Sequence, residues 1–156
     1  MDRNVARLLD GRAVGETSAG ARDRDAVWFG GRARALTVET HVDERGWLAA
    51  LDFDVLGFDV ARAFVVGSGH GISRGGHGHR RGRQLLTLVS GRVRVDMRWR
   101  RATGSVELSG DHRSLLLEPG VWARQTYLDE SACLVVFCDT PYDPEDYVPD
   151  PDDAGW

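Results

Sequence analysis

Short apolar runs, spaced as in β-strands, make up most of this chain from residue 35 onward. Examples are RVRVDMRWR (92–100) and ACLVVFCD (132–139), whose length and apolar spacing are typical of strands packed on a core. Comparable runs occupy residues 34–42, 47–55, 60–67, 83–91, 105–109, 114–120 and 122–128. Gly, Asp and Ser separate nearly all of them, and no long amphipathic helix interrupts the series. The pattern predicts an all-β barrel or sandwich, with residues 34–55 forming a hairpin around the turn DERG.

The ends of the chain differ in texture from its middle. Residues 1–34 alternate in charge sign and contain Gly11, Gly15, Gly20, Gly30 and Gly31, which predicts a mobile N-terminal arm. A length of 156 residues suits one domain, which we place at residues 35–150. Residues 151–156 form an acidic tail, and we expect the proline-rich stretch YDPEDYVPDPDDAGW to lie over the surface or to end in disorder.

Charge and hydropathy exclude several classes of partner. The formal net charge is -4, which argues against nucleic acid as the main partner. All 20 basic residues are arginine, and their clusters at 80–83 and 92–101 indicate either a solvated strand face or a site for an anionic small ligand. The first twenty residues are charged throughout, and no apolar run reaches the ~18 residues of a membrane span. We therefore expect a cytoplasmic protein without membrane contact. Cys133 and Cys138 lie five positions apart in one apolar run, on opposite faces of the expected strand, and we expect both to be core thiols.

Candidate chemistry is concentrated in the stretch RGGHGHRRGRQ, residues 74–84. Residues i and i+2 of a strand share a face, so His77 and His79 can point into one cavity while Gly78 faces away. The neighbouring glycines let the backbone bend and approach a ligand closely. The residues alone leave three interpretations open: a metal site, an acid/base site, or a solvated basic loop.

The spacing around these histidines resembles the first motif of the cupins, which are jelly-roll barrels. The match runs from Gly71 through the histidine pair to Gly91, with Gln84 in the position of the motif's glutamate. The second cupin motif aligns with EPGVWAR, where Ala123 takes the place of the last ligand histidine. Two imidazoles and a neutral amide are a poor donor set for a transition metal. We therefore expect no metal and no cofactor, and keep a dioxygenase metal site at His77, His79 and Gln84 only as a residual alternative.

Residues 38–150 resemble more specifically the WxcM-like cupins, which include the dTDP-4-keto-6-deoxyglucose 3,4-ketoisomerases. The matching pieces are DERGWLAALDF (43–53), FDVARAFVV (58–66), RGGHGHR (74–80), QLLTLVSGRVRVD (84–96), LEPGVW (117–122) and YDPEDYVPD (142–150). The resemblance implies a metal-independent jelly-roll homodimer that moves a carbonyl between adjacent sugar carbons by proton transfer. Its first hairpin strand would otherwise be an exposed apolar edge, which also favours pairing with a second copy.

The resemblance assigns roles to individual residues. His77 matches the family's histidine pair as the expected proton shuttle, since an unperturbed imidazole titrates near neutral pH, and His79 is expected to assist it. Guanidinium groups suit phosphate and enediolate oxygens, and amide or phenol groups can hold a sugar. The expected substrate-binding residues are Arg62, Arg74, Gln84, Gln125 and Tyr127. The last two are expected from the strand pattern, because they share a face with residue 123 and could supply the polar group that Ala123 lacks.

The chain also departs from the family at several pocket positions. Phe64 and Val65 stand where the family commonly has tyrosines, and Ala123 and Arg124 stand where it has histidine and glutamate. These changes keep two alternatives open beside a ketoisomerase acting on a dTDP-4-keto-6-deoxyhexose. One is a cupin isomerase or cyclase that tailors a natural-product intermediate without a nucleotide. The other is a non-catalytic barrel that binds a small ligand.

Overall fold

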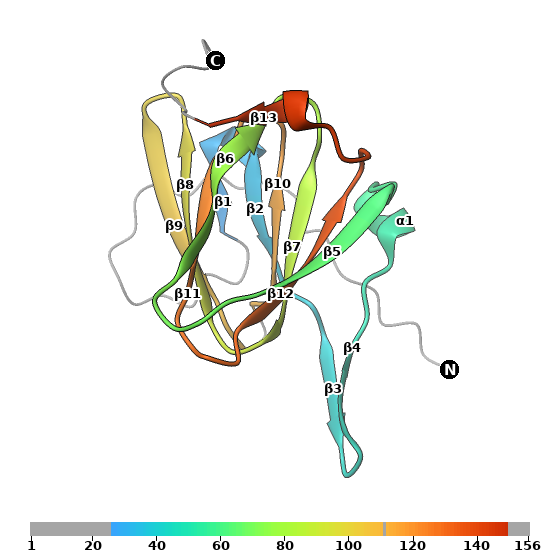
Figure 1. Ribbon diagram of the computed structural model, residues 1–156. Helices are drawn as coiled ribbons and strands as arrows, with labels where there is room; N and C mark the ends of the chain where they lie inside the picture. The colour runs from blue at the N-terminus through green and yellow to red at the C-terminus, as the bar shows by residue number, and fades with distance from the viewer. Residues whose placement is uncertain (1–25, 111, 150–156) are drawn as a thin grey trace.

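Two antiparallel sheets face each other in the computed structural model, which describes residues 26–110 and 112–149. Figure 1 shows the sheets closing into a flattened barrel from which one hairpin projects. Strands far apart in the sequence lie side by side in both sheets. The predicted all-β, cupin-type jelly roll is confirmed.

The strands fall into three groups. The six-stranded sheet has the order β1 (Val27–Trp28), β2 (Ala33–Leu36), β10 (Ser114–Leu117), β7 (Gln84–Ser90), β12 (Cys133–Cys138) and β5 (Arg62–Gly67). The five-stranded sheet has the order β13 (Tyr147–Val148), β6 (Ser73–His79), β11 (Trp122–Tyr127), β8 (Val93–Trp99) and β9 (Ala102–Leu108). The projecting hairpin consists of β3 (Thr40–Asp43) and β4 (Gly46–Ala49). The described residues also form three short helical turns: η1 (Phe29–Gly31), α1 (Phe53–Leu56) and η2 (Pro144–Asp146).

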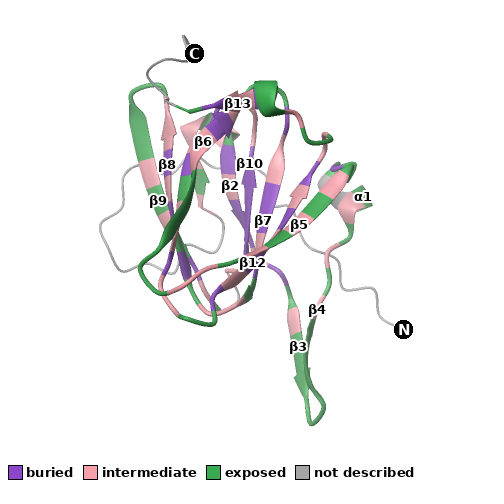
Figure 2. Ribbon diagram, in the orientation of Figure 1, coloured by how far each residue is buried: buried purple, intermediate pink, exposed green. Residues whose placement is uncertain are grey.

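The core lies between the two sheets (Figure 2). Strand β8 shows why, because Val93, Val95 and Met97 alternate inward and are all buried. This is the period of two that a sheet with one covered face requires. Truncating a buried side chain such as Met97 to alanine costs about 2–5 kcal/mol, so this alternation contributes strongly to the stability of the barrel.

The outer face of the six-stranded sheet is covered as well. Leu85 on β7 and Leu116 on β10 point away from the main core and form a second cluster with Leu36 and Phe58. Phe53 of α1 packs against this cluster. Covering both faces explains why these two strands carry consecutive apolar residues, as doubly buried strands do.

The hairpin in the structure is shorter than the one predicted for residues 34–55. The run 34–42 divides into β2 in the large sheet and β3 in the hairpin, and the run 47–55 ends as strand β4 before turning into α1. Gly57 ends α1 in a left-handed conformation with φ of 60°, as glycine does after a helix. Tertiary contacts cause the difference. Phe53 and Phe58 pack on the sheet, and the segment around them forms α1 instead of the second half of the predicted strand.

Both predicted chain ends need correction where the structure describes them. Residues 1–25 and 150–156 lie outside the described residues, so the arm and the acidic tail 151–156 stay predictions there. Residues 27–34 belong to β1, η1 and the start of β2, so the barrel begins inside the predicted arm. Residues 144–148 do not merely cover the surface, because Tyr147 and Val148 pair with His79 and Gly78 of β6.

In the part of the chain that the structure describes, no helix is long and apolar enough to cross a membrane.

Candidate active site

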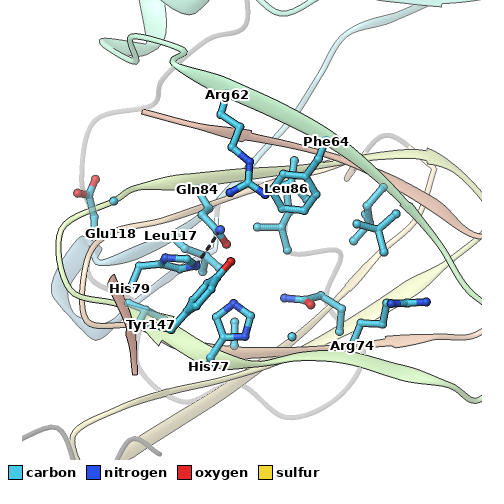
Figure 3. A pocket seen from close by; sticks show the side chains of 18 of the residues that line it. Arg62, Phe64, Arg74, His77, His79, Gln84, Leu86, Leu117, Glu118 and Tyr147 are labelled. Atoms are coloured by element: carbon cyan, nitrogen blue, oxygen red, sulfur yellow. Dashed lines mark hydrogen bonds between the residues drawn. The ribbon is translucent and has the colours of Figure 1, made fainter. Parts of the chain in front are cut away.

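One cavity of about 220 Å³ opens between the two sheets, and the predicted site residues all line it. Figure 3 shows several of these side chains converging from opposite walls. The predicted residues that the structure brings together here are Arg62, Arg74, His77, His79, Gln84, Gln125 and Tyr127. Ala123 lies in the same lining.

The histidine pair sits on β6, on the wall formed by the five-stranded sheet. Gly75 precedes it with φ of 76°, a conformation that side chains with a Cβ rarely adopt. A Cβ at Gly75 would meet Oε1 of Gln125 at 2.4 Å. Strand β11 has a register irregularity beside it, between Ala123 and Arg124. The glycine therefore lets β6 approach β11 closely, which carries the two histidines into the cavity.

The ring nitrogens of His79 are both held by neighbouring side chains. Its Nδ1 lies 3.0 Å from Oδ2 of Asp146, and its Nε2 lies 2.9 Å from the amide Nε2 of Gln84. A carboxylate can only accept, so Nδ1 carries the proton and Nε2 accepts from the Gln84 amide. Burial lowers the pKa of His79, and the hydrogen bond to Asp146 opposes that shift without reversing it. His79 is therefore a neutral imidazole of fixed tautomer and orientation.

Asp146 is a buried carboxylate with several donors around it. It accepts hydrogen bonds from His79 and from the backbone N–H of Arg81, at 2.8 Å. Burial acts to raise its pKa, but these donors outweigh it and leave the pKa below its ordinary value. Asp146 is thus ionised at neutral pH and fixes the ring of His79.

His77 is held far less tightly than His79. Its ring stands at 72° to that of His79, with centroids 5.2 Å apart, and at 72° to that of Tyr147, at 4.4 Å. No hydrogen bond joins its ring to the side chain of another described residue, but the ring donates one to the backbone carbonyl of Gly75. Burial and the neighbouring His79 lower its pKa. His77 is consequently unprotonated at neutral pH and able to accept a proton.

Sequence reasoning missed Asp146 and Tyr147 as site residues. Both come from the C-terminal stretch, where η2 places the carboxylate behind His79 and β13 places the phenol beside it. The signal that could have found them is the stretch YDPEDYVPD, which matches the ending of the resembled family. Acidic residues and prolines in this stretch indicated a surface segment instead.

Arg62 supplies positive charge on the wall formed by the six-stranded sheet. Its guanidinium lies over two aromatic rings, 4.7 Å from the centroid of Phe64 and 4.9 Å from that of Tyr142. Cation–π contacts of this kind orient an arginine without neutralising it, and no described carboxylate forms an ion pair with Arg62. Figure 3 shows its side chain reaching from β5 toward the cavity. Phe64, which replaces a family tyrosine, therefore supports the arginine rather than adding a polar group.

The cavity lining also includes Arg74, Gln125 and Tyr127, and Gln125 on β11 pairs with Arg74 on β6. Arg74 is exposed and lies at the opposite end from Glu118 (Figure 3). Tyr127 is only 1% exposed, and its hydroxyl donates to the carbonyl of Val66 at 3.4 Å. Burial raises the pKa of Tyr127 to about 12. The hydroxyl of Tyr127 is thus already bonded within the cavity wall, whereas the guanidinium of Arg74 is accessible to an anionic group.

Cupin barrels commonly hold a metal, but these residues do not fit one. Among the residues the structure describes, no group of three or more histidine, cysteine or acidic side chains is placed to hold a metal ion. The Nε2 of His79 faces an amide donor, and Ala123, at the position of the third histidine, lies directly across from His77 in the strand register. The arrangement instead suits proton transfer on a small ligand with negative charge, since a free base, an oriented imidazole and a guanidinium face one cavity.

Solved structures share this fold at low sequence identity. The sugar 3,4-ketoisomerase QdtA from Thermoanaerobacterium thermosaccharolyticum, solved with TDP, is 24% identical over 78% of this chain and 90% of that one, with a TM-score of 0.71. A 3,4-ketoisomerase from Helicobacter canadensis is 23% identical over 77% of this chain and 92% of that one, at 0.70. The rmlC epimerase of Mycobacterium tuberculosis is 22% identical over 74% of this chain and 67% of that one, at 0.66.

No curated protein matches the chain by sequence. A family model does match, over residues 32–154, and its description is WxcM-like, C-terminal. The match covers the barrel from β2 onward, including the histidine pair and the C-terminal stretch that completes the cavity. The chain therefore belongs to the WxcM-like, C-terminal family.

Proposed function

We propose that this protein is a metal-independent 3,4-ketoisomerase that acts on a nucleotide-linked 4-keto-6-deoxyhexose, as a step in deoxysugar biosynthesis. The observation that carries the proposal is that the two histidines differ in their hydrogen bonds to neighbouring side chains. His79 is locked between Asp146 and Gln84, whereas His77 keeps a lowered pKa and no side-chain hydrogen bond among the described residues. An unprotonated imidazole beside one of fixed tautomer suits a reaction in which one proton leaves a carbon and returns to its neighbour.

His77 would act as both base and acid. As the unprotonated imidazole it takes the proton from sugar carbon 3, and the electrons move onto the carbonyl oxygen at carbon 4 to give an enediolate. The imidazolium then returns a proton to carbon 4 while the hydroxyl proton on oxygen 3 passes to oxygen 4, which leaves the ketone at carbon 3. Arg62 would stabilise the enediolate, because a positive charge already oriented by Phe64 and Tyr142 needs little reorganisation as charge develops.

The size of the cavity supports a sugar ring as the enclosed part of the substrate. A volume of about 220 Å³ is below the ~300–1,000 Å³ of typical sites for drug-sized ligands. The nucleotide would then lie outside the cavity, where the exposed guanidinium of Arg74 is available to the diphosphate. QdtA, which shares the fold, was solved with TDP and, as a variant, with TDP-4-keto-6-deoxyglucose.

We also propose that the protein is a homodimer. The hairpin β3–β4 pairs only with itself among the described strands, and its Val42, Trp47 and Leu48 are 77%, 53% and 60% exposed. A two-stranded hairpin is marginally stable alone, and strand edges with apolar side chains invite pairing. The edge strand β5 of the large sheet carries Val65, 70% exposed, as a further apolar position. A second copy covering the hairpin would bury this surface in a closed two-fold arrangement.

The test is direct conversion of dTDP-4-keto-6-deoxyglucose, followed by NMR. We expect a 3-keto product, with turnover unchanged by a chelator and with less than stoichiometric zinc, iron or nickel by elemental analysis. Thermal unfolding with dTDP should show stabilisation, because a ligand that binds only the folded state must raise its stability. Absence of product from the folded protein would reject the proposal, and loss of turnover on chelation would reject its metal independence.

One observation favours a second candidate, an isomerase or cyclase that tailors a natural-product intermediate without a nucleotide. The cavity wall contains Phe64, Leu86, Leu117, Ala123 and Val136, so much of its surface is apolar. A less polar substrate would suit that wall. Stabilisation by dTDP separates the two candidates, since only the nucleotide-sugar enzyme should bind it.

A further inference from the structure

Of the described residues that line the cavity, only Tyr127 and Tyr147 carry a hydroxyl group. The two are in different states. The hydroxyl of Tyr127 is buried and donates to the backbone carbonyl of Val66. No hydrogen bond joins the hydroxyl of Tyr147 to another described residue. Tyr147 is therefore the phenol that remains available to a ligand.

Tyr147 is also placed against both histidines. Its ring centroid lies 4.4 Å from that of His77 and 5.0 Å from that of His79. Strand β13 fixes this position by pairing Tyr147 directly with His79 on β6. Figure 3 shows the phenol extending from β13 into the cavity, with its oxygen at the end that faces the interior.

The proposed isomerisation requires two separate proton movements. One proton leaves carbon 3 and another joins carbon 4, which His77 can accomplish. In addition, the hydroxyl proton on oxygen 3 must be lost and oxygen 4 must gain one, because the carbonyl and the hydroxyl exchange places. The two oxygens are adjacent in the enediol, so one hydroxyl group that both donates and accepts can serve them.

We propose, on the basis of the function proposed above, that Tyr147 is a catalytic residue that relays this second proton. Its hydroxyl gives a proton to oxygen 4 as negative charge develops there, and it takes the proton from oxygen 3 as the new carbonyl forms. The tyrosine ends unchanged, and together with the cycle of His77 all atoms and charges balance. His79 is unsuited to the relay, because Asp146 and Gln84 occupy both of its ring nitrogens.

Tyr147→Phe tests the relay, with Ser105→Ala as a control that removes a hydroxyl group outside the cavity lining. Phenylalanine keeps the ring contacts with His77 and His79 and removes only the hydroxyl. We expect kcat of Tyr147→Phe to fall by about 10²-fold or more, the contribution typical of a positioned acid/base, while KM and dTDP affinity stay within about threefold. Ser105→Ala, which loses only the exposed bond to Asp96, should keep most of its turnover.

A partial reaction distinguishes a relay from a structural role. In deuterated water, exchange at sugar carbon 3 requires His77 but not the oxygen relay, so the ratio of exchange to product should rise in Tyr147→Phe. Turnover of Tyr147→Phe near the wild-type level would overturn the relay while leaving the proposed function intact. A fall in turnover matched by an equal loss of dTDP binding would assign Tyr147 to binding and also overturn it. Absence of product from the wild type would reject the proposed function and the relay together.

Discussion

The Nδ1 atom of His79 lies 3.0 Å from Oδ2 of Asp146, although the two residues are 67 positions apart in the sequence. The carboxylate is 5% exposed and ionised, so it determines which nitrogen of the imidazole carries the proton. On the other side of the ring, the amide of Gln84 donates to Nε2. A C-terminal segment therefore fixes the chemical state of a histidine on β6.

Asp146→Asn should disturb this tautomer. The amide has one acceptor oxygen where the carboxylate has two, so either the Arg81 backbone or His79 loses its acceptor. We expect turnover to fall by about 10–100-fold, as when a group that orients a functional imidazole is removed, with KM changing less. Nitrogen chemical shifts of the His79 ring should report a shift of the proton from Nδ1 toward Nε2, which a merely structural role would not produce.

Asp143→Asn is the matched control for this variant. Asp143 lies at the start of the same turn, accepts from the N–H of Glu145 and pairs with Arg81, but makes no contact with His79. Asp143→Asn should leave the chemical shifts of the His79 ring and the turnover unchanged. Equal losses in both variants would indicate that the turn as a whole, rather than the carboxylate behind His79, is what matters.

Gln84→Glu should change the charge state of His79. A carboxylate at this position would accept a hydrogen bond from the Nε2–H of the protonated ring, which would then lie between two carboxylates. Opposite charges favour the protonated form, so the pKa of His79 should rise from its lowered value. An NMR titration of the ring should show a higher midpoint than in the wild type, while Gln84→Met, which cannot accept, should not raise it. A midpoint unchanged by Gln84→Glu would mean that residue 84 does not bond His79 in solution.

Acidification should destabilise the fold in two separate windows. The pKa values of His77 and His79 lie below 6.5 because of burial, so between 6.5 and those values the unfolded chain binds protons that the folded state does not. The free energy of unfolding should therefore decrease as the pH falls through this window. Asp146 has a pKa below 3.8, so its contribution is present above 3.8 and is lost as the pH falls through its folded value.

Urea unfolding at closely spaced pH values measures both windows. His77→Gln should flatten the change just below pH 6.5, and Asp146→Asn should flatten the change below pH 3.8. His41→Gln, on the exposed hairpin, serves as the control histidine. An unfolding free energy that is the same in wild type and His77→Gln at every pH would contradict the burial of His77 as a neutral ring.

Much of the barrel could be predicted from short-range patterns, and the exceptions have a common cause. The strand period placed β7, β8, β11 and β12, and the i, i+2 rule placed His77 and His79 on one face. Residues 53–55 are predicted as strand because Phe and Val favour it, but packing on the outer face of the sheet makes them part of α1. Asp146 and Tyr147 were missed for the same reason, because their position also depends on tertiary contacts. The sequence of this acidic, proline-rich stretch does not indicate that β13 pairs with β6.

If the hairpin β3–β4 forms the proposed dimer interface, charged substitutions on it should prevent dimerisation. Val42→Asp and Leu48→Asp place charges on the exposed apolar faces of β3 and β4, and we expect light scattering at micromolar concentration to show a dimer for the wild type and a monomer for the double variant. The fold of the monomer should persist, because the hairpin forms its own sheet apart from the barrel. Glu44→Arg changes charge at the hairpin turn without altering the apolar faces and should remain dimeric. A monomeric wild type would refute the proposed assembly.

The enzymatic proposal depends most on His77. His77→Asn keeps approximate size and polarity, so the fold and much of the dTDP affinity should survive, whereas turnover should fall by the ~10²–10⁴-fold that a positioned acid/base contributes. His79→Asn should be milder, because that ring is held by Asp146 and Gln84 and only assists. Normal product formation by His77→Asn would remove His77 from the mechanism. A wild type that neither binds dTDP nor forms product would instead favour the natural-product candidate, since the lowered pKa of His77 would serve proton abstraction from a less polar substrate equally well.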